Sequence, residues 1–462
     1  MKLDFLNRTI ELQRLTAATQ SCEPKLIIVY GRRRCGKSRL LNQLPAERHI
    51  YHLADLSEPA LQRINLANDI SRYVSGFNDA VYPNWESLFS SFFSRILQGK
   101  ETSPYTLTLD EFPYLARLDT SLPSILQKLI DTGRLATHLI LCGSPQRMMH
   151  DMVLDQSAPL YGRAAEILKI EPLPAGWICD ALGRTGKTAV RDYAVWGGVP
   201  RYWESVKPFS SLKDAVNDLV FNKHGLFHQE PHRLLVDDMR SDVQPHSLLS
   251  VIAGGCHRLS EIAARLGKQA VSLANPLALL MDLGYIKRDI PYGESLRSTK
   301  RTLYRLSDPF LLFWYRYVYP SLSLLEQDVT QPVVEQWERH FGFHCGEIWE
   351  NLARLSVPRI QIGGIQWKEA HRWWGKDTNG ADCEVDVVAE SIDGKNILIG
   401  EAKWEKFSDA ARIAPKLRRS AETLPFAHKV NMIHAIWCPD AAAGCVDGCF
   451  LFNAEQVLEA LR

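Results

Sequence analysis

The chain contains 462 residues, and its 54 lysines and arginines nearly balance its 53 aspartates and glutamates, giving a formal net charge of +1. This length exceeds one ordinary hydrophobic core and predicts about three domains. The charge balance excludes a globally basic nucleic-acid-binding protein, so any such surface must be local.

The first residues argue against export and membrane insertion. The stretch "MKLDFLNRTIELQRL" carries charges where a signal peptide needs an apolar core, and the longest apolar stretch, "PFLLFWY", stops at Arg316. Ten cysteines are scattered through most of the chain, which suits a reducing compartment. We therefore expect a cytoplasmic protein with no membrane partner.

One group of metal-ligand residue types is denser than the rest and consists of His434, Cys438, Cys445 and Cys449. Its spacing lacks the C-x-x-C pairs of structural zinc sites. Buried or incidental thiols are the favoured interpretation, and metal binding is the alternative.

The stretch "KLIIVYGRRRCGKSRLLNQL" contains a phosphate-binding loop. It fits G-x-x-x-x-G-K-[ST] at Gly31, Gly36, Lys37 and Ser38, directly after an apolar strand over residues 26–30 and before a helix-like segment. Glycines let the backbone close around phosphates, the lysine reaches the β and γ phosphates, and the serine ligates Mg²⁺. We expect ATP contacts along the whole loop, including Arg32, Arg33, Arg34, Cys35 and Arg39. A similar stretch, "GRTGKT" at 183–188, has Ala181 where the first glycine should be, and we interpret it as a solvated turn.

Two further strands carry polar residues that complete a nucleotide site. After a second strand in "ERHIYHLADL", a third in "SPYTLTLDEFPYL" ends in Asp110 and Glu111. An acid at the end of a strand beside the loop can hold Mg²⁺ through water, and the next carboxylate can orient or deprotonate the attacking water. The strand in "THLILCGSPQRMM" delivers Gly143 and Ser144 to the same edge of the sheet, where Ser144 could sense the γ phosphate.

Arg163, in "APLYGRAAEI", is a candidate for stabilising transition-state charge, either in its own chain or across a subunit boundary in a homo-oligomer. An ordinary surface arginine is the alternative.

The motifs "FLNRTIELQRL", "GRRRCGKS", "LTLDEF", "LCGS", "LYGR" and "YAVWGGVPRYW" occur in this order. In this order they resemble the archaeal-type ATPases, a branch of AAA-related P-loop proteins. The resemblance implies a helical segment after the ATPase core, with a signature at Gly197, Gly198 and Pro200, that acts as a lid reporting nucleotide state.

Residues 241–325 parse as three helices followed by a strand pair, which is typical of a winged helix-turn-helix. DNA binding is the functional interpretation, because the wing region is basic at Lys287, Arg288, Arg297, Lys300 and Arg301. A packing module is the alternative, because the recognition helix "AVSLANPLALL" lacks a basic residue and carries Pro276.

A second constellation lies in "EVDVVAESIDGKNILIGEAKW". The alternation of "EVDVVAE" predicts Glu384 and Asp386 on one face of a strand and Val385 and Val387 on the other. Glu401 and Lys403 are two apart on the next strand, and Asp393 with Gly394 supplies an antiparallel turn.

Asp386, Glu401 and Lys403 form a D…E-x-K arrangement, which suits metal-assisted phosphodiester hydrolysis. The two carboxylates would bind Mg²⁺ or Mn²⁺, Lys403 would orient water, and Glu350 is a further ligand candidate. With "RWWG" at 372–375, the pattern resembles the PD-(D/E)XK nuclease fold, a domain with which archaeal-type ATPases commonly end. A merely solvated hairpin is the alternative.

The resulting expectation is an α/β protein with four parts: a parallel-sheet AAA-type P-loop core (1–170), a helical lid segment (171–240), a winged helix-turn-helix (241–325) and a restriction-endonuclease-like domain (330–462). The first functional hypothesis is an ATPase whose nucleotide state controls a nuclease-like domain acting on nucleic acid. The second is a nucleotide-dependent switch or DNA-binding regulator whose C-terminal domain cuts nothing.

Overall fold

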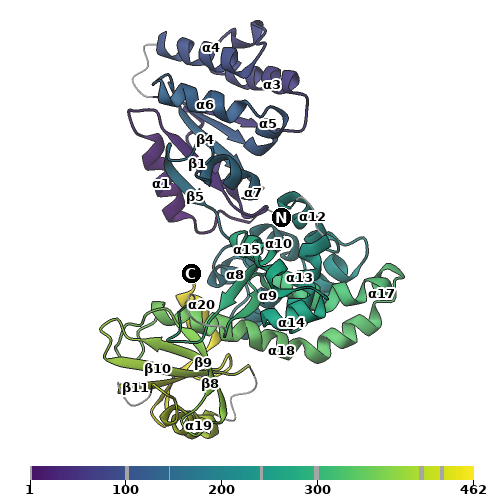
Figure 1. Cartoon of the computed structure of the whole chain (residues 1–462), viewed down its shortest axis with the longest axis vertical. Coiled ribbons are helices and arrows are strands. Elements are labelled where there is room, and N and C mark those ends of the chain that lie inside the picture. Colours follow the sequence, from purple (N-terminus) through teal and green to yellow (C-terminus); the bar gives the residue numbers. More distant parts are fainter. Residues whose placement is uncertain are drawn as a thin grey trace. The chain divides into compact units, whose positions relative to one another are not determined.

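The structure is a computed structural model that describes residues 3–98, 104–144, 146–239, 243–295, 301–404, 410–426 and 431–462. Its contacts divide the chain into two compact units, whose helices and strands are labelled in Figure 1. The N-terminal unit comprises residues 7–172 with 237–239, and the C-terminal unit comprises residues 1–6, 173–236 and 240–462. Within the described ranges, no helix has the length and apolar character needed to cross a membrane.

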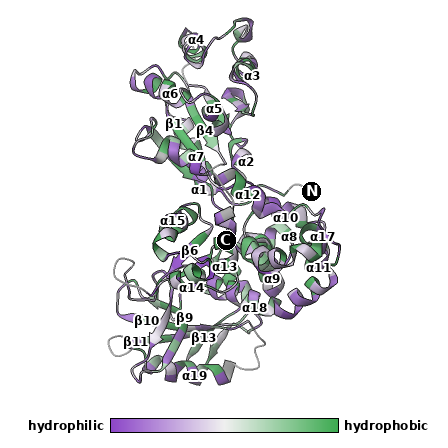
Figure 2. Cartoon of the chain, turned by 45° about the vertical axis from the view of Figure 1, so that its right-hand side comes forward, coloured by the Kyte–Doolittle hydropathy of each residue, from purple (hydrophilic) through white to green (hydrophobic). Residues whose placement is uncertain are grey.

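The N-terminal unit is built on a parallel sheet with the strand order β2-β3-β4-β1-β5. The strands are β1 (Leu26–Tyr30), β2 (His49–Leu53), β3 (Thr106–Asp110), β4 (His138–Gly143) and β5 (Ala164–Lys169). β3 and β4 are buried along their whole length, as central strands covered on both faces should be. Figure 2 shows the hydrophobic character of β1 and β4. The parallel-sheet α/β core predicted from the sequence is confirmed.

Amphipathic helices complete this core. They are α1 (Thr9–Thr19), α2 (Lys37–Leu41), α3 (Pro59–Ser71), α4 (Trp85–Gln98), α5 (Phe112–Leu118), α6 (Leu122–Asp131) and α7 (Gln146–Met149). In α4, Trp85, Phe89, Phe92 and Phe93 recur at helical spacing and lie in one buried cluster with residues of the sheet. This rigid packing holds the carboxyl ends of the strands at one edge.

A helical segment follows the N-terminal sheet in the chain and contains α8 (Ile178–Leu182), α9 (Gly186–Trp196), α10 (Pro200–Val206), α11 (Leu212–Val216) and α12 (Glu230–Asp238). All of it belongs to the C-terminal unit except the last two residues of α12. The interpretation of "GRTGKT" as a solvated turn is wrong for its second half, because Gly186 opens α9 and Lys187 Nζ lies 2.5 Å from an Asp440 carboxylate oxygen. Glycine is required at position 198, because a Cβ there would lie 2.0 Å from Leu173 O.

Three helices and a hairpin follow, in the order predicted for a winged helix. They are α13 (Val243–Ala253), α14 (Leu259–Arg265), α15 (Ala274–Asp282), and the antiparallel strands β6 (Ile286–Asp289) and β7 (Leu303–Leu306). Pro276 is the third residue of α15, where a missing N–H costs little because the first turn lacks intrahelical acceptors.

A mixed sheet with the order β12-β13-β11-β10-β9-β8 forms the last part of the chain. Its strands are β8 (His371–Lys376), β9 (Asp382–Glu390), β10 (Asn396–Ala402), β11 (Asn431–Trp437), β12 (Gly444–Val446) and β13 (Cys449–Phe452). The long helix α18 (Gln331–Ser356) contacts β9 and β10, and α19 (Ala410–Glu422) shares a buried cluster with β8, β9 and β10. Two short helices, α16 (Pro309–Phe313) and α17 (Leu322–Glu326), precede α18.

The last helix, α20 (Ala454–Ala460), packs back onto the helical segment. Leu461 O accepts a hydrogen bond from Gly176 N at 3.0 Å, and Arg462 forms an ion pair with Asp180 at 2.9 Å. The helical segment and the mixed sheet therefore lie in the same compact unit, and the four-part division of the chain stays a prediction.

Candidate nucleotide site and C-terminal carboxylate cluster

The phosphate-binding loop connects the end of β1 to the start of α2. Gly31 has a φ of +146°, and a Cβ there would lie 2.2 Å from Ile170 O. Gly36 has a φ of +92°, which favours glycine. Both positions of the motif thus favour glycine because their φ angles are positive, and Gly31 also has no room for a Cβ beside Ile170 O.

Lys37 points its ammonium group into this loop. The side chain is 4% exposed, and Nζ donates hydrogen bonds to Gly31 O at 2.9 Å and Arg32 O at 3.2 Å. Both acceptors are neutral carbonyls, so the loop holds a buried positive charge. A phosphate group is a natural counter-charge for such a site.

Ser38 and Asp110 meet at the carboxyl edge of the sheet. Ser38 Oγ donates to Asp110 Oδ2 at 2.6 Å, and Tyr51 OH donates to the same oxygen. In the sheet, β4 lies between β3, which bears Asp110, and β1, which precedes the loop. The two oxygens nevertheless come together, and hard oxygen donors of this kind are what Mg²⁺ prefers.

Tyr51 was not singled out from the sequence. Burial and the Asp110 carboxylate both raise the pKa of this phenol, so Tyr51 remains a hydrogen-bond donor to Asp110. Its position on β2, paired in register with Thr108 of β3, brings it to the same edge. Only the strand order reveals this neighbour.

Glu111 is held in place by the end of β4. Ser144 Oγ donates to Glu111 Oε1 at 2.7 Å, and Ser144 N donates to Oε2 at 3.3 Å. Glu111 has a φ of +54°, a left-handed conformation that costs a side-chain-bearing residue about 1 kcal/mol or more. The structure thus brings Ser144 to the predicted edge and gives its hydroxyl to Glu111.

Arg8 holds the backbone of the phosphate-binding loop through hydrogen bonds, a role that the sequence analysis missed. The side chain is 6% exposed, Nη2 donates to Cys35 O at 3.2 Å and to Glu171 O, and Nη1 donates to Glu11 Oε1 at 2.9 Å. The spacing of Arg8 and Glu11 is a helical i, i+3 pair, which alone indicates only a surface ion pair.

Arg163 lies at the opposite edge of the sheet. The next residue, Ala164, pairs with Leu26 at the start of the parallel strand β1, whereas the phosphate-binding loop follows the end of that strand. Five residues of strand span about 17 Å, beyond the reach of an arginine side chain. Arg163 instead forms a bidentate ion pair with Asp131, at 2.7 and 2.8 Å. A role in its own chain's nucleotide site is therefore wrong, and a role across a subunit boundary stays a prediction.

Asp386, Glu401 and Lys403 are brought together in the mixed sheet. Lys403 Nζ lies 2.5 Å from Glu401 Oε1, and Asp386 Oδ2 accepts a hydrogen bond from Ala402 N at 3.0 Å. Burial and the Asp386 carboxylate raise the pKa of Glu401. Burial alone would lower the pKa of Lys403, but its hydrogen bond to Glu401 raises it.

Asp386 lies in a β-bulge that the sequence pattern did not reveal. His371 pairs with Val388 and Trp373 pairs with Val385. Between these two pairs the chain moves two positions along β8 but three positions along β9, so β9 contains one extra residue. Val385 and Val388 consequently share the cluster under α19. The predicted alternation, with Val385 and Val387 on one face, is wrong because a bulge shifts the phase of a strand.

Glu350, on α18, lies within electrostatic reach of this group. Burial and then the Asp386 carboxylate raise its pKa to about 7, although Arg372 and Arg354 oppose them. Its carboxylate is 3.7 Å from Arg372 Nη2 and 4.0 Å from Arg354 Nη1.

The predicted pair of metal-binding carboxylates, with Glu350 as a further candidate, stays a prediction. Over the described ranges, no group of three or more His, Cys, Asp or Glu side chains is arranged to hold a metal ion. Glu350 faces two arginines, Asp386 accepts a backbone amide, and Glu401 pairs with Lys403. The same finding covers the described residues of the cysteine-rich stretch, where only His434 and Cys449 pair across strands.

The basic wing predicted from the sequence is described only in part. Lys287 is held by its neighbours: its Nζ donates to Asn351 Oδ1 at 2.7 Å and lies 3.8 Å from an Asp289 carboxylate oxygen, and partial burial lowers its pKa, although 38% of the side chain is exposed. Its charge is therefore engaged within the fold. Arg288 and Arg301 remain, while Arg297 and Lys300 lie outside the described residues.

Comparisons with known proteins bear on both units. Residues 5–181 match a family described as an ATPase domain predominantly from Archaea, and residues 314–413 match a family described as archaeal and bacterial proteins of unknown function. An uncharacterized protein of Methanocaldococcus jannaschii is 28% identical over 416 residues, covering 88% of each chain.

The chain is also similar in structure to a Walker-type ATPase of Pyrococcus abyssi, with a TM-score of 0.52 at 19% identity, over 68% of this chain and 96% of that one. The similarity shows a shared fold. Residues 5–181 therefore have a P-loop fold and resemble the ATPase domains that are found predominantly in Archaea. The family matched by residues 314–413 brings no activity with it, so the nuclease-like identity of the C-terminal domain stays a prediction.

Proposed function

We propose that the chain hydrolyses ATP and that its nucleotide state controls the contact of the C-terminal unit with nucleic acid. The convergence of Lys37, Ser38, Asp110 and Glu111 at one edge of the N-terminal sheet carries this proposal. Phosphoryl transfer to water requires a buried ammonium group, a hydroxyl beside a carboxylate, and a second carboxylate that is fixed in orientation. Lys37, Ser38 with Asp110, and Glu111 supply these groups.

Each residue has a distinct part in this scheme. Lys37 binds the phosphates, and Ser38 with Asp110 would hold Mg²⁺, which neutralises phosphate charge when bound. Glu111, oriented by Ser144, accepts the proton of the attacking water or aligns that water. Arg8 keeps the loop backbone in position through Cys35 O.

Two substitutions separate binding from turnover. Lys37→Ala should abolish ATP hydrolysis and weaken ATP binding, because the phosphates lose the buried ammonium group that points into the loop, whereas Glu111→Gln should keep binding and lose turnover. The measurements are phosphate release and nucleotide titration by calorimetry. Lys128→Ala is the matched control, since Lys128 is exposed and pairs with Glu86 at 2.7 Å. Wild-type hydrolysis in both active-site variants would refute the proposal.

A second candidate function is phosphodiester cleavage in the C-terminal unit, as in the first of the two hypotheses from the sequence. The juxtaposition of Asp386, Glu401 and Lys403 favours it, because paired carboxylates with a lysine suit water activation beside a phosphate. The residues do not form a three-carboxylate metal group, so we assign no step to a metal there. A C-terminal unit that only binds is the competing interpretation.

Cleavage of labelled single- and double-stranded substrates distinguishes these interpretations. Reactions with Mg²⁺, Mn²⁺ or a chelator are compared, each with and without ATP. Asp386→Ala and Lys403→Ala should remove cleavage and leave ATP hydrolysis intact. Lys368→Ala is the matched control, because Lys368 pairs with Glu390 at 2.9 Å on the same sheet. If the wild type cuts neither substrate under any condition, the binding interpretation replaces this one.

A further inference from the structure

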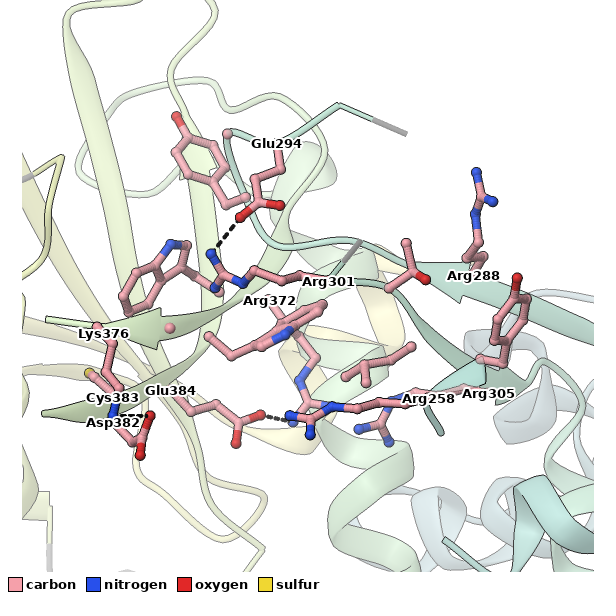
Figure 3. Close-up of a pocket in the computed structure, with 18 of the residues that line it drawn as sticks. Arg258, Arg288, Glu294, Arg301, Arg305, Arg372, Lys376, Asp382, Cys383 and Glu384 are labelled. Atoms are coloured by element: carbon pink, nitrogen blue, oxygen red, sulfur yellow. Dashed lines mark hydrogen bonds and ion pairs between the residues drawn. The ribbon is translucent and has the colours of Figure 1, made fainter. Parts of the chain in front are cut away.

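A groove within the C-terminal unit lies between the β6–β7 hairpin and the sheet edge formed by β8 (Figure 3). Its volume is about 1610 Å³. Arg288, Tyr292 and Arg301 line it from the hairpin side. Tyr292 N donates a hydrogen bond to Arg372 O at 2.8 Å, so the two walls are joined through the backbone.

The groove is lined by more cations than anions, as Figure 3 shows. The cations are Arg258, Arg288, Arg301, Arg305, Arg372 and Lys376, and the anions are Glu294, Asp382 and Glu384. Glu294 pairs with Arg301 at 2.5 Å, Asp382 with Lys376 at 2.9 Å, and Glu384 with Arg372. Of the other three cations, Arg258 lies 3.8 Å from Glu261 and Arg305 is paired with two acids outside the lining, so the surplus that attracts a polyanion rests on Arg288.

Arg288 is the clearest part of that surplus. Within the part of the chain that the structure describes, its guanidinium makes no ion pair or hydrogen bond, and the side chain is half-buried in the groove wall. Arg305, by contrast, is held by Asp289 at 3.5 Å and Glu347 at 2.9 Å. Arg288 is thus a cation already positioned in the groove and available to a ligand.

Aromatic rings are interleaved with these charges. Tyr292, Trp374 and Phe426 are partly exposed in the groove, and Phe426 makes edge contacts with Tyr292 at 5.4 Å and with the buried Trp373 at 5.6 Å. Because Trp373 points into the core of the sheet, its neighbour Trp374 is turned to the opposite face. Such rings offer flat surfaces to unpaired bases.

We propose that this groove binds single-stranded nucleic acid, with a phosphate on Arg288 and a base stacked on Trp374. Single strands expose both a charged backbone and free base faces, whereas a duplex hides its base faces and would leave the aromatic rings unused. The inference rests on the proposed function in that nucleic acid is the partner of the C-terminal unit.

The groove also leads to the carboxylate cluster. Arg372 lines the groove, contacts Glu384 and lies 3.7 Å from Glu350. The pKa of Glu350 is in turn raised partly by Asp386. A strand lying along β8 would therefore pass Arg372, whose guanidinium is engaged by Glu384 and Glu350, on the border of the residues proposed for cleavage.

The test is fluorescence anisotropy of a labelled oligothymidylate of about 15 nucleotides, with the full chain in a chelator so that nothing is cut. Arg288→Ala should weaken binding and reduce the slope of log affinity against log salt by about 0.7, the value for one lost phosphate contact on a single strand. Trp374→Ala should weaken binding on the order of tenfold with the salt slope unchanged, and Trp374→Phe should restore most of it.

Two exposed residues of α18 provide matched controls. Arg339→Ala and Phe343→Ala remove a cation and a ring outside the groove, and both should bind like the wild type. Thermal unfolding of every variant identifies any loss caused by misfolding, and Trp374→Phe keeps the test valid if Trp374→Ala does not fold.

Three results would overturn the groove assignment: wild-type binding by both Arg288→Ala and Trp374→Ala, tighter binding of a duplex of the same sequence, or equal competition by polyglutamate. The assignment fails independently of the proposed function. Lys37→Ala should keep oligonucleotide binding while losing hydrolysis, and Arg288→Ala should keep hydrolysis while binding the oligonucleotide more weakly.

Discussion

Ser144 links the end of β4 to the acid that follows β3. Its hydroxyl donates to Glu111 at 2.7 Å, and Glu111 already sits in a left-handed backbone conformation. We predict that Ser144→Ala lowers kcat for ATP about tenfold and leaves ATP binding unchanged, because only the orientation of Glu111 is lost. Ser157→Ala is the control, since Ser157 makes a similar bond to Asp155 on the surface. A weakened ATP affinity instead would indicate that Ser144 contacts phosphate directly.

Glu350 and Glu347 lie one helical turn apart on α18, and their pKa values are shifted in opposite directions. Burial and Asp386 raise the pKa of Glu350 to about 7. Burial alone would raise the pKa of Glu347 as well, but Arg316 and Arg305 lower it to about 2. Ionisation of Glu350 therefore destabilises the fold increasingly as the pH rises from about 4.5 through 7. Ionised Glu347 has the opposite effect: it stabilises the fold above a pH of about 4.5, and this stabilisation is lost as the pH falls toward 2.

We predict that Glu350→Gln raises the free energy of unfolding by about 2 kcal/mol at pH 8 and by much less at pH 5. Glu347→Gln should lower it at both pH values, because the two arginines lose their counter-charge. Urea unfolding at each pH measures both effects. Equal destabilisation by Glu350→Gln at the two pH values would show that its arginine contacts outweigh its desolvation.

At the scale of elements, the turn between α9 and α10 depends on a close backbone approach. A Cβ on Gly198 would lie 2.0 Å from Leu173 O, and Gly198 O accepts a hydrogen bond from Leu173 N at 2.7 Å. We predict that Gly198→Ala destabilises the C-terminal unit by about 3 kcal/mol or more, since two backbones would have to separate. Gly183→Ala, at a left-handed helix end with open space around it, should cost only about 1 kcal/mol. Thermal unfolding compares the two, and equal losses would contradict the close-approach explanation.

The whole molecule joins an ATPase domain to a unit with a basic and aromatic groove. If nucleotide state controls that unit, oligothymidylate affinity should differ between ATP and ADP on the order of tenfold, a typical coupling between sites. Lys37→Ala should remove the difference while keeping the affinity measured without nucleotide, and Lys128→Ala should preserve it. Anisotropy titrations with each nucleotide measure this coupling. The same affinity with ATP, with ADP and without nucleotide would show two independent functions in one chain.

Local patterns in the sequence were sufficient for the nucleotide loop and the strands around it. A five-residue apolar strand followed by glycines, lysine and serine has few alternative structures, because the spacing itself dictates strand, loop and helix. The same holds for Glu401 and Lys403, whose two-residue spacing places them side by side on any strand.

Contacts between distant segments were beyond such patterns. The insertion of β4 between β3 and β1, the donation of Tyr51 to Asp110, and the placement of Arg163 at the far edge all follow from strand order, which is set by the packing of the whole sheet. The bulge at Asp386 depends on the register between β8 and β9, and the hydrogen bond from Lys287 to Asn351 depends on α18 lying beside the hairpin. The sequence by itself determined which groups are present at each strand end and turn. Only the tertiary structure decided which of them face each other, because hydrogen-bond register and side-chain packing join residues that are far apart in the chain.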